Sequence, residues 1–338
     1  VYADDTLKEV AEVFAADYEE ITGMAIEAVK GTDAKAGDIC FVLTDDASLG
    51  LKDEGYLMEI GDKITVTAEA ATGAYWATRT ILQSYKANDN TINKGITRDY
   101  PLYEIRGFIL DAGRKTFTMD YLQQVVNMMS WYKMNDFQVH LNDNLIPLEH
   151  YSQLGEDPMQ AYSAFRLESD IKAGGNDGLN QADLTSTDLF YTKDEFRSFI
   201  QDSRVRGVDI VPEIDTPAHS LALTKVRPDL RQGTYGRQND HLNLTDKYND
   251  SLSFVQSIFN EYMGEEVKNP VFDEETIVHV GADEYSADGD AYRRFCNDMF
   301  EYVQDTGRTA RVWGSLTSIK GTGAVDVRGD QHDSGRVQ

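Results

Sequence analysis

The spacing of apolar residues predicts a small α/β unit at the start of the chain. Positions i, i+3, i+4 and i+7 form one helix face, which contains Leu7, Val10, Ala11 and Phe14. Residues 39–43 and 64–67 are apolar runs typical of strands, and residues 74–82 indicate a second helix. Tyr100-Pro101 then interrupts the pattern, so we assign residues 1–100 to a first, small α/β domain.

From Arg106 onward, short apolar runs alternate with amphipathic helical stripes. The runs that predict strands cover residues 107–110, 137–141, 208–211, 276–280 and 311–313. Thr192 and Glu195 have the spacing of a capping box at the start of one of the helices. Strands that alternate with helices predict a parallel sheet. Residues 142–191 form a long insertion rich in Gly, Asn and Asp, and loops of this length are usually functional or disordered.

Acidic, basic and aromatic side chains collect where the predicted strands end. They are Asp111, Arg114, His140, Asp143, Glu213, Asp215, His219, Asp283, Glu284 and Trp313. Barrel enzymes build their sites at this end of the strands, and no Gly-rich phosphate loop follows the first strand, which disfavours a dinucleotide-binding fold. We therefore predict a (β/α)8 TIM-type barrel over residues 101–338. Fewer strands are recognisable than the eight that a barrel needs, and a parallel sheet with an open edge would favour aggregation. We therefore expect the sequence to stop near a sixth strand, which residues 336–338 could begin.

Charge and composition narrow the possible partners. With 58 acidic and 32 basic side chains the net charge is −26, which argues against a nucleic-acid partner because phosphate contacts need clustered Lys and Arg. No apolar run approaches the ~20 residues that cross a bilayer. The first residues have neither a starting Met nor a basic segment, so we expect a removed signal peptide or a cut fragment. Cys40 and Cys296 suit buried, inert thiols better than a disulfide framework or a zinc site.

The adjacent acids Asp283 and Glu284 are the sharpest local signal. Like charges this close raise one pKa, which suits a proton donor at neutral pH, although acids are also favoured at helix N-termini. Two other readings stay open. One is a metal-dependent barrel hydrolase that uses acids and histidines at the strand ends, namely Asp111, His140, Asp215 and His219. The other is a carbohydrate-binding barrel without catalysis, against which the intact acid pair argues.

Four motifs at the strand ends resemble those of family 20 glycoside hydrolases, the β-N-acetylhexosaminidase family. They span residues 106–114, 139–143, 211–219 and 279–284, and the similarity extends over about residues 35 to 315. The sequence departs from the usual pattern at Lys115, Asn144, Ala218 and Ala282. Together with the insertion, these departures resemble the bacterial lacto-N-biosidase branch. That likeness implies release of the disaccharide Gal-β-1,3-GlcNAc from oligosaccharide ends, the alternative being exo-acting release of single GlcNAc or GalNAc residues.

The resemblance also implies a mechanism and a set of roles. The substrate's own 2-acetamido oxygen would attack the anomeric carbon with overall retention, giving an oxazolinium intermediate. Glu284 would be the general acid and then the base, and Asp283 would orient the acetamido group. Arg114 and Asp143 would bind sugar hydroxyls, His219 would lie near the acids, and Trp313 would line the acetamido pocket; for Arg114, a salt bridge to Asp111 is the alternative.

Further expectations concern the substrate and its surroundings. The candidates for contacts to a galactose are Asn142, Asn144 and the polar side chains of the insertion. The resemblance implies no cofactor and no metal, and an oligosaccharide substrate with β-linked N-acetylglucosamine of the human-milk or mucin type. It also implies a secreted bacterial protein that is extracellular or at the cell surface.

Overall fold

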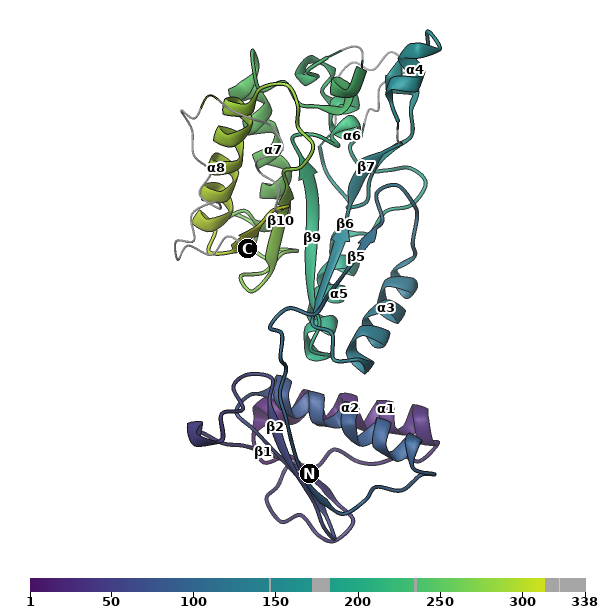
Figure 1. Cartoon of the computed structure of the whole chain (residues 1–338), viewed down its shortest axis with the longest axis vertical. Helices are drawn as coiled ribbons and strands as arrows, with labels where there is room; N and C mark the ends of the chain where they lie inside the picture. Colours follow the sequence, from purple (N-terminus) through teal and green to yellow (C-terminus); the bar gives the residue numbers. More distant parts are fainter. Residues whose placement is uncertain (146, 172–182, 234–235, 314–321, 323–338) are drawn as a thin grey trace. The chain divides into compact units, whose positions relative to one another are not determined.

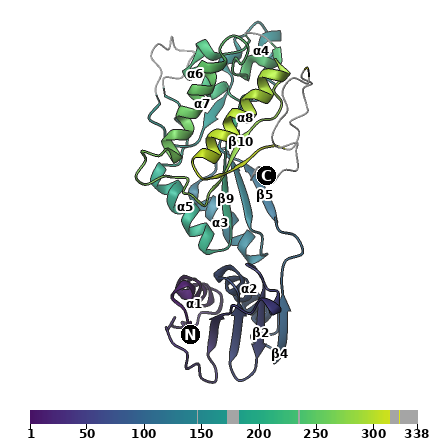
Figure 2. The ribbon, with the colours of Figure 1, turned by 90° about the vertical axis from the view of Figure 1, so that its left-hand side faces the viewer.

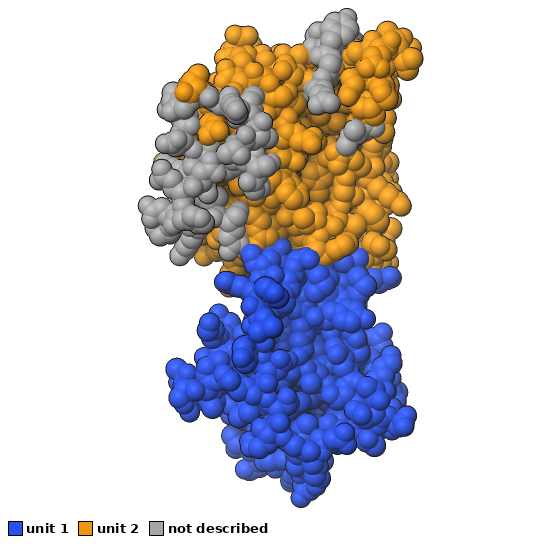
Figure 3. All heavy atoms as spheres, viewed as in Figure 1, with its two compact units in different colours: residues 1–107, 123–136, 201–208 blue, residues 108–122, 137–200, 209–338 orange. Residues whose placement is uncertain are grey.

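A computed structural model of the chain describes residues 1–145, 147–171, 183–233, 236–313 and 322. The chain forms two compact units (Figure 3). Unit 1 contains residues 1–107, 123–136 and 201–208, and unit 2 contains residues 108–122, 137–200 and 209–338.

Unit 1 is built on a four-stranded sheet with the order β1-β3-β2-β4. The strands are β1 (Ile39–Leu43), β2 (Tyr56–Ile60), β3 (Ile64–Ala68) and β4 (Gly95–Asp99). β1 pairs parallel with β3, whereas β2 pairs antiparallel with both β3 and β4. The strands predicted at 39–43 and 64–67 are therefore confirmed, and β2 and β4 are additions that the apolar pattern does not reveal.

The helices α1 (Lys8–Thr22) and α2 (Ala71–Ala87) lie on the same side of this sheet (Figures 1 and 2). Phe14 and Trp76 are buried with strand residues in one apolar core, as the helical spacing predicts. Asp17 of α1 is also buried, and it forms an ion pair with Arg79 of α2 at 2.7 Å. A buried carboxylate needs such a partner because leaving it unpaired would cost several kcal/mol.

Unit 2 contains a five-stranded sheet with the order β11-β10-β9-β6-β5 (Figure 1). Its strands are β5 (Gly107–Asp111), β6 (Asp136–His140), β9 (Asp209–Thr216), β10 (Ile277–Gly281) and β11 (Thr309–Arg311). The pairs β9–β10 and β10–β11 are parallel. The predicted alternation of strands and helices along the chain is confirmed: the helices that lie between these strands in sequence are α3 (Met119–Trp131), α5 (Lys193–Val205), α6 (Leu221–Val226), α7 (Tyr248–Met263) and α8 (Gly289–Asp305). Most of α3 and the end of α5 fall within unit 1. The sheet is thus part of a TIM-type barrel; the sixth strand expected at 336–338 lies outside the described residues.

The insertion after β6 has more regular structure than its composition suggests. β7 (Asn142–Asn144) pairs antiparallel with β8 (Ser163–Phe165), and α4 (Glu149–Gln153) lies between them in the chain. Arg166, which directly follows β8, is fully buried and donates to the carbonyl oxygens of Ala112 at 2.7 Å and Gly113 at 3.1 Å. The described part of the insertion therefore supports the loop after β5.

Two smaller expectations have clear outcomes. The capping box is present: Thr192 N donates to Glu195 Oε2 at 2.9 Å, and Glu195 N donates to Thr192 Oγ1 at 3.1 Å. Cys40 and Cys296 are free and buried, and burial raises the pKa of the Cys296 thiol to about 12, which makes it unreactive. Among the described helices, none combines the length and apolar character needed to cross a membrane.

Candidate active site

The strand ends of unit 2 bring the predicted site residues together around His219. Its ring Nδ1 lies 3.1 Å from Asp143 Oδ1, and its Nε2 lies 3.3 Å from Asp283 Oδ1 and 3.5 Å from Glu284 Oε2. Burial disfavours a charged imidazole, but the hydrogen bond that His219 donates to Asp143 and the surrounding carboxylates raise the pKa of His219 to about 10. His219 is therefore a buried cation that bridges the end of the second barrel strand to the acid pair after β10.

Asp143 is saturated by donors from four directions. Its Oδ2 lies 2.6 Å from His140 Nε2 and 2.8 Å from Arg114 Nη2, while its Oδ1 meets His219 and the backbone N–H of Asn144 at 2.7 Å. Burial alone would raise the pKa of Asp143, but the hydrogen bonds and charges of His140 and His219 hold it well below its usual range. These contacts use the four acceptor positions that a carboxylate offers. Asp143 is thus placed to orient Arg114 and His219, and the hydroxyl contact predicted for it would require one of these bonds to yield.

Arg114 forms the salt bridge to Asp111 that the sequence offers as an alternative to a sugar contact. Its Nη1 lies 2.9 Å from Asp111 Oδ2, and its Nε donates to the backbone oxygen of Asn144 at 3.1 Å. The side chain remains about a third exposed. The salt bridge to Asp111 therefore exists, and it leaves the guanidinium partly open to a ligand.

A second layer of charge is centred on Glu213, which is fully buried in β9. Its Oε2 lies 2.9 Å from His140 Nδ1 and accepts from Gln138 at 2.8 Å, and its Oε1 accepts from Trp313 Nε1 at 2.6 Å. Burial opposes ionisation, but the hydrogen bond and charge of His140 lower the pKa of Glu213 to about 2. Trp313 is accordingly anchored through its indole N–H, with its ring in edge contact with His279.

The backbone after β10 has an unusual conformation that sets the two acids. Gly281, Ala282 and Glu284 have φ angles of 75°, 70° and 49°. A Cβ on Gly281 would lie 1.8 Å from Asp215 Oδ1, so only glycine fits there. The left-handed turn leaves the Asp283 side chain 26% exposed and the Glu284 side chain 74% exposed. Glu284 is therefore open to a substrate, whereas Asp283 is held closer to the protein.

Two acids at this turn, Asp215 of β9 and Asp283, have raised pKa values. Asp215 is buried and its Oδ1 has no hydrogen-bond partner among the described residues. Burial raises the pKa of Asp215 well above its usual value, and burial also raises the pKa of Asp283, although His219 opposes this second shift. The site thus holds several acids without requiring all of them to be charged at once.

Asn142 and Asn144 do not face a sugar in this structure. Both side chains are buried, with 0% and 2% of the residue exposed. Asn142 exchanges two hydrogen bonds with the backbone of Asp215, and Asn144 Nδ2 donates to Asp240 Oδ2 at 3.1 Å. The prediction that these amides contact galactose is therefore corrected to a positioning role, because a buried, bonded amide cannot reach a ligand.

The metal-site reading gains partial geometric support. Possible ligand atoms lie within 4.8 Å of one another in two groups, His140, Glu213 and Asp215, and Asp143, Asp215 and His219; Asp111 is in neither. The Arg114 guanidinium touches the second group, and neighbouring carboxylates raise the pKa of both histidines. A histidine ligand must be deprotonated, so these charges disfavour a bound cation.

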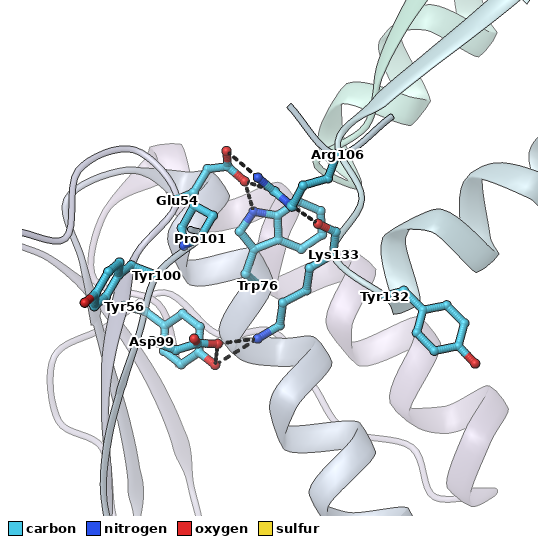
Figure 4. Close-up of a pocket in the computed structure, with 9 residues that line it drawn as sticks. All are labelled: Glu54, Tyr56, Trp76, Asp99, Tyr100, Pro101, Arg106, Tyr132 and Lys133. Carbon is cyan, nitrogen blue, oxygen red and sulfur yellow. Dashed lines mark hydrogen bonds and ion pairs between the residues drawn. The ribbon is translucent and has the colours of Figure 1, made fainter. Parts of the chain in front are cut away.

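Unit 1 has a pocket of its own, about 140 Å³ in volume (Figure 4). Its lining consists of Glu54, Tyr56, Trp76, Asp99, Tyr100, Pro101, Arg106, Tyr132 and Lys133. The charged groups of this pocket form ion pairs with one another. Glu54 pairs with Arg106 and accepts a hydrogen bond from Trp76 Nε1 at 2.8 Å. Lys133 Nζ lies 2.7 Å from Asp99 Oδ2. This pocket is a set of internal ion pairs and contains none of the predicted site residues.

Comparison with known proteins identifies the family. Residues 103–306 match the family model "Glycosyl hydrolase family 20, catalytic domain", and residues 1–100 match "Glycosyl hydrolase family 20, domain 2". The chain belongs to glycosyl hydrolase family 20. The resemblance drawn from the four motifs is thereby confirmed at the level of the family, and the motif acids lie within the matched catalytic domain.

Individual relatives of this family 20 chain are distant. A lacto-N-biosidase from Bifidobacterium bifidum is 24% identical over 337 residues, which cover 93% of this chain and 27% of the relative. A β-N-acetylhexosaminidase from Cellulomonas fimi is 26% identical over 319 residues, covering 90% of this chain and 59% of the relative. The chain thus spans less than two thirds of these relatives.

Solved structures support the fold. The β-N-acetylhexosaminidase of Bacteroides fragilis superposes with a TM-score of 0.69 at 23% identity, covering 94% of this chain and 62% of that one. A mutant Streptomyces plicatus β-hexosaminidase in complex with its product GlcNAc gives 0.67 at 20% identity, with 96% and 63% covered. At these identities the likeness shows the shared architecture.

Proposed function

We propose that the protein is a retaining, exo-acting glycoside hydrolase for β-linked N-acetylglucosamine, with the substrate's acetamido group as nucleophile. The observation that carries the proposal is the Asp283–Glu284 pair on one turn, with His219 within 3.5 Å of both carboxylates. A two-carboxylate retaining site needs its acids on opposite sides of the sugar, about 5–5.5 Å apart. Neighbouring acids on one turn suit a substrate that supplies its own nucleophile, and family membership supports the same reading.

In the first proposed step, the acetamido oxygen attacks the anomeric carbon while Glu284 protonates the leaving oxygen. Asp283 accepts a hydrogen bond from the acetamido N–H and balances the positive charge of the oxazolinium ion. In the second step, Glu284 removes a proton from water as the water oxygen attacks the anomeric carbon. This attack opens the oxazolinium ring, and the proton restores Glu284 to its acid form. Holding the acetamide in place supplies proximity, which is worth on the order of 7–11 kcal/mol at its limit.

We propose that the released product is the disaccharide Gal-β-1,3-GlcNAc, with release of single N-acetylhexosamine residues as the alternative. The support is the insertion after β6 and the likeness to the Bifidobacterium bifidum lacto-N-biosidase. Because Asn142 and Asn144 face inward, the galactose contacts would come from other side chains near this strand end. We also propose oligosaccharides of the human-milk or mucin type as substrates and an extracellular or cell-surface location.

A side-by-side assay tests both levels of the proposal. Chromogenic β-N-acetylglucosaminide and β-lacto-N-bioside are offered to the full natural protein, with and without chelator. We expect the bioside to be cleaved faster, without loss in chelator, and Glu284→Gln to reduce kcat on unactivated substrates about 10²–10⁴-fold. Faster cleavage of the monosaccharide would reject only the disaccharide assignment. Binding without turnover would indicate a carbohydrate-binding barrel, and loss in chelator would indicate a metal enzyme.

A further inference from the structure

The proposed general acid has few side-chain contacts of its own. Glu284 is 74% exposed, and its carboxylate lies 3.5 Å from His219 Nε2. Its position therefore depends on the backbone on either side of it. On the N-terminal side, Tyr292 OH donates to the carbonyl oxygen of Ala282 at 2.6 Å. An equivalent anchor is needed on the C-terminal side.

That anchor is His241, a buried residue from a different loop. Its Nε2 accepts a hydrogen bond from the backbone N–H of Ser286 at 3.1 Å, two residues after Glu284. Since Nε2 accepts, Nδ1 carries the proton, and it donates to Asp240 Oδ1 at 2.8 Å. The ring also stacks on Tyr285 with centroids 4.9 Å apart. His241 thus fixes both residues that follow the acid.

The same short segment holds the loops that carry the other site residues. Asp240 Oδ2 accepts from Asn144 Nδ2 at 3.1 Å, beside the backbone oxygen that Arg114 contacts. The backbone oxygen of Asp240 accepts from Ser220 N at 2.8 Å, directly after His219. Asp240 and His241 therefore connect the ends of the second, third and fourth barrel strands in this unit.

We propose that Asp240 and His241 are positioning residues that hold Glu284 in place to protonate the leaving oxygen. The inference rests on the proposed function, since it assigns a means of placing the proposed acid. Asp240 fixes the tautomer of His241, and His241 in that tautomer fixes the peptide after Glu284. A displaced acid would fail specifically where protonation is needed, because a leaving group that is already a stable anion departs without a proton.

The test uses that difference in the full natural protein. His241→Phe keeps an aromatic ring against Tyr285 but removes both hydrogen bonds. We expect kcat/KM to fall at least about 10-fold on an unactivated oligosaccharide, which is part of the ~10²–10⁴-fold that a general acid supplies. On the 2,4-dinitrophenyl glycoside we expect kcat/KM to change less than about threefold. Tyr302→Phe on α8 removes one hydrogen bond, to the backbone oxygen of Gln256, outside the site and the insertion, and should alter neither value.

Other outcomes separate the possible failures. Equal losses of kcat/KM on both substrates in His241→Phe, or no loss, would overturn the positioning role. The proposed function would still stand if the wild-type protein were active and Glu284→Gln lost activity mainly on the unactivated substrate. A wild-type protein without glycosidase activity would reject the proposed function itself. If His241→Phe does not fold, Asp240→Asn replaces it: an amide has one acceptor oxygen for the two donors, Asn144 and His241, so the same selective loss is expected. A uniform loss in that variant would again reject the inference.

Discussion

Asp143→Asn should be the most destabilising of the conservative changes in the site. The carboxylate accepts from Arg114, His140, His219 and the backbone, whereas an amide has one acceptor oxygen and would turn its own N–H groups toward donors. Removing one partner from a buried charge cluster costs about 3–5 kcal/mol. Asp111→Asn is the matched control, because Asp111 also pairs with Arg114, at 2.9 Å, but is 37% exposed, and exposed pairs contribute about 0.2–1 kcal/mol.

Urea unfolding of the two variants, followed by tryptophan fluorescence, measures this difference. The pH dependence adds a second check. His219 has a raised pKa, so its stabilising contribution is complete below its ordinary pKa of 6.5 and is lost as the pH rises toward about 10. Asp143→Asn removes the hydrogen bond that raises this pKa, so the gap between wild type and variant should narrow from pH 6.5 to 10. Equal costs for the two variants, or a gap independent of pH, would refute the assignment of Asp143 as the anchor of His219.

Two further predictions concern the turn after β10. Gly281→Ala should destabilise the protein by about 1–3 kcal/mol through overpacking against Asp215, and should reduce kcat because the acid pair moves; wild-type unfolding and kinetics would contradict this. Tyr292→Phe should cost about 0.5–1.5 kcal/mol and lower kcat, since Ala282 loses its hydrogen bond. Tyr302→Phe on the same helix is the control, because it breaks a comparable hydrogen bond to the backbone oxygen of Gln256. This control variant should lose similar stability and keep its kcat. Equal losses of kcat in both variants would count against the role of Tyr292.

Sequence reasoning succeeded where the determining contacts are local. Thr192 and Glu195 are three residues apart, and their capping box could be read directly. The apolar runs of β9 and β10 carry their own signal because most of their side chains are buried. β4 was missed for the opposite reason: its side chains are largely exposed, and its backbone pairing with β2 defines it. Pairing of that kind leaves no period in the sequence.

The same distinction explains the errors within the site. The position of Asp143 at a strand end was foreseen, but not that four donors, from β6, from β7 and from the loops after β5 and β9, would occupy its oxygens. Asp240 meets Asn144 across 96 residues and His241 meets Ser286 across 45, so no spacing rule could connect them. The inward direction of Asn142 and Asn144 likewise depends on β9 and the loop after it. Motifs place residues at a strand end, and only the fold determines which of them face the ligand.

The charges of the assembled site suggest why so many acids can share it. Arg114, His140 and His219 supply positive charge, and the pKa of each histidine is raised. Against them stand Asp143 and Glu213, whose pKa values are lowered, while burial raises the pKa of Asp215. Uncompensated buried charge is costly, so this balance is itself a condition of the fold. In the proposed reaction the acid pair then becomes the variable part: as the oxazolinium ion forms, Glu284 passes its proton to the leaving oxygen, and the carboxylate of Asp283 beside it balances the positive charge. The negative charge thus appears where and when the intermediate needs it, which is the differential stabilisation that catalysis requires.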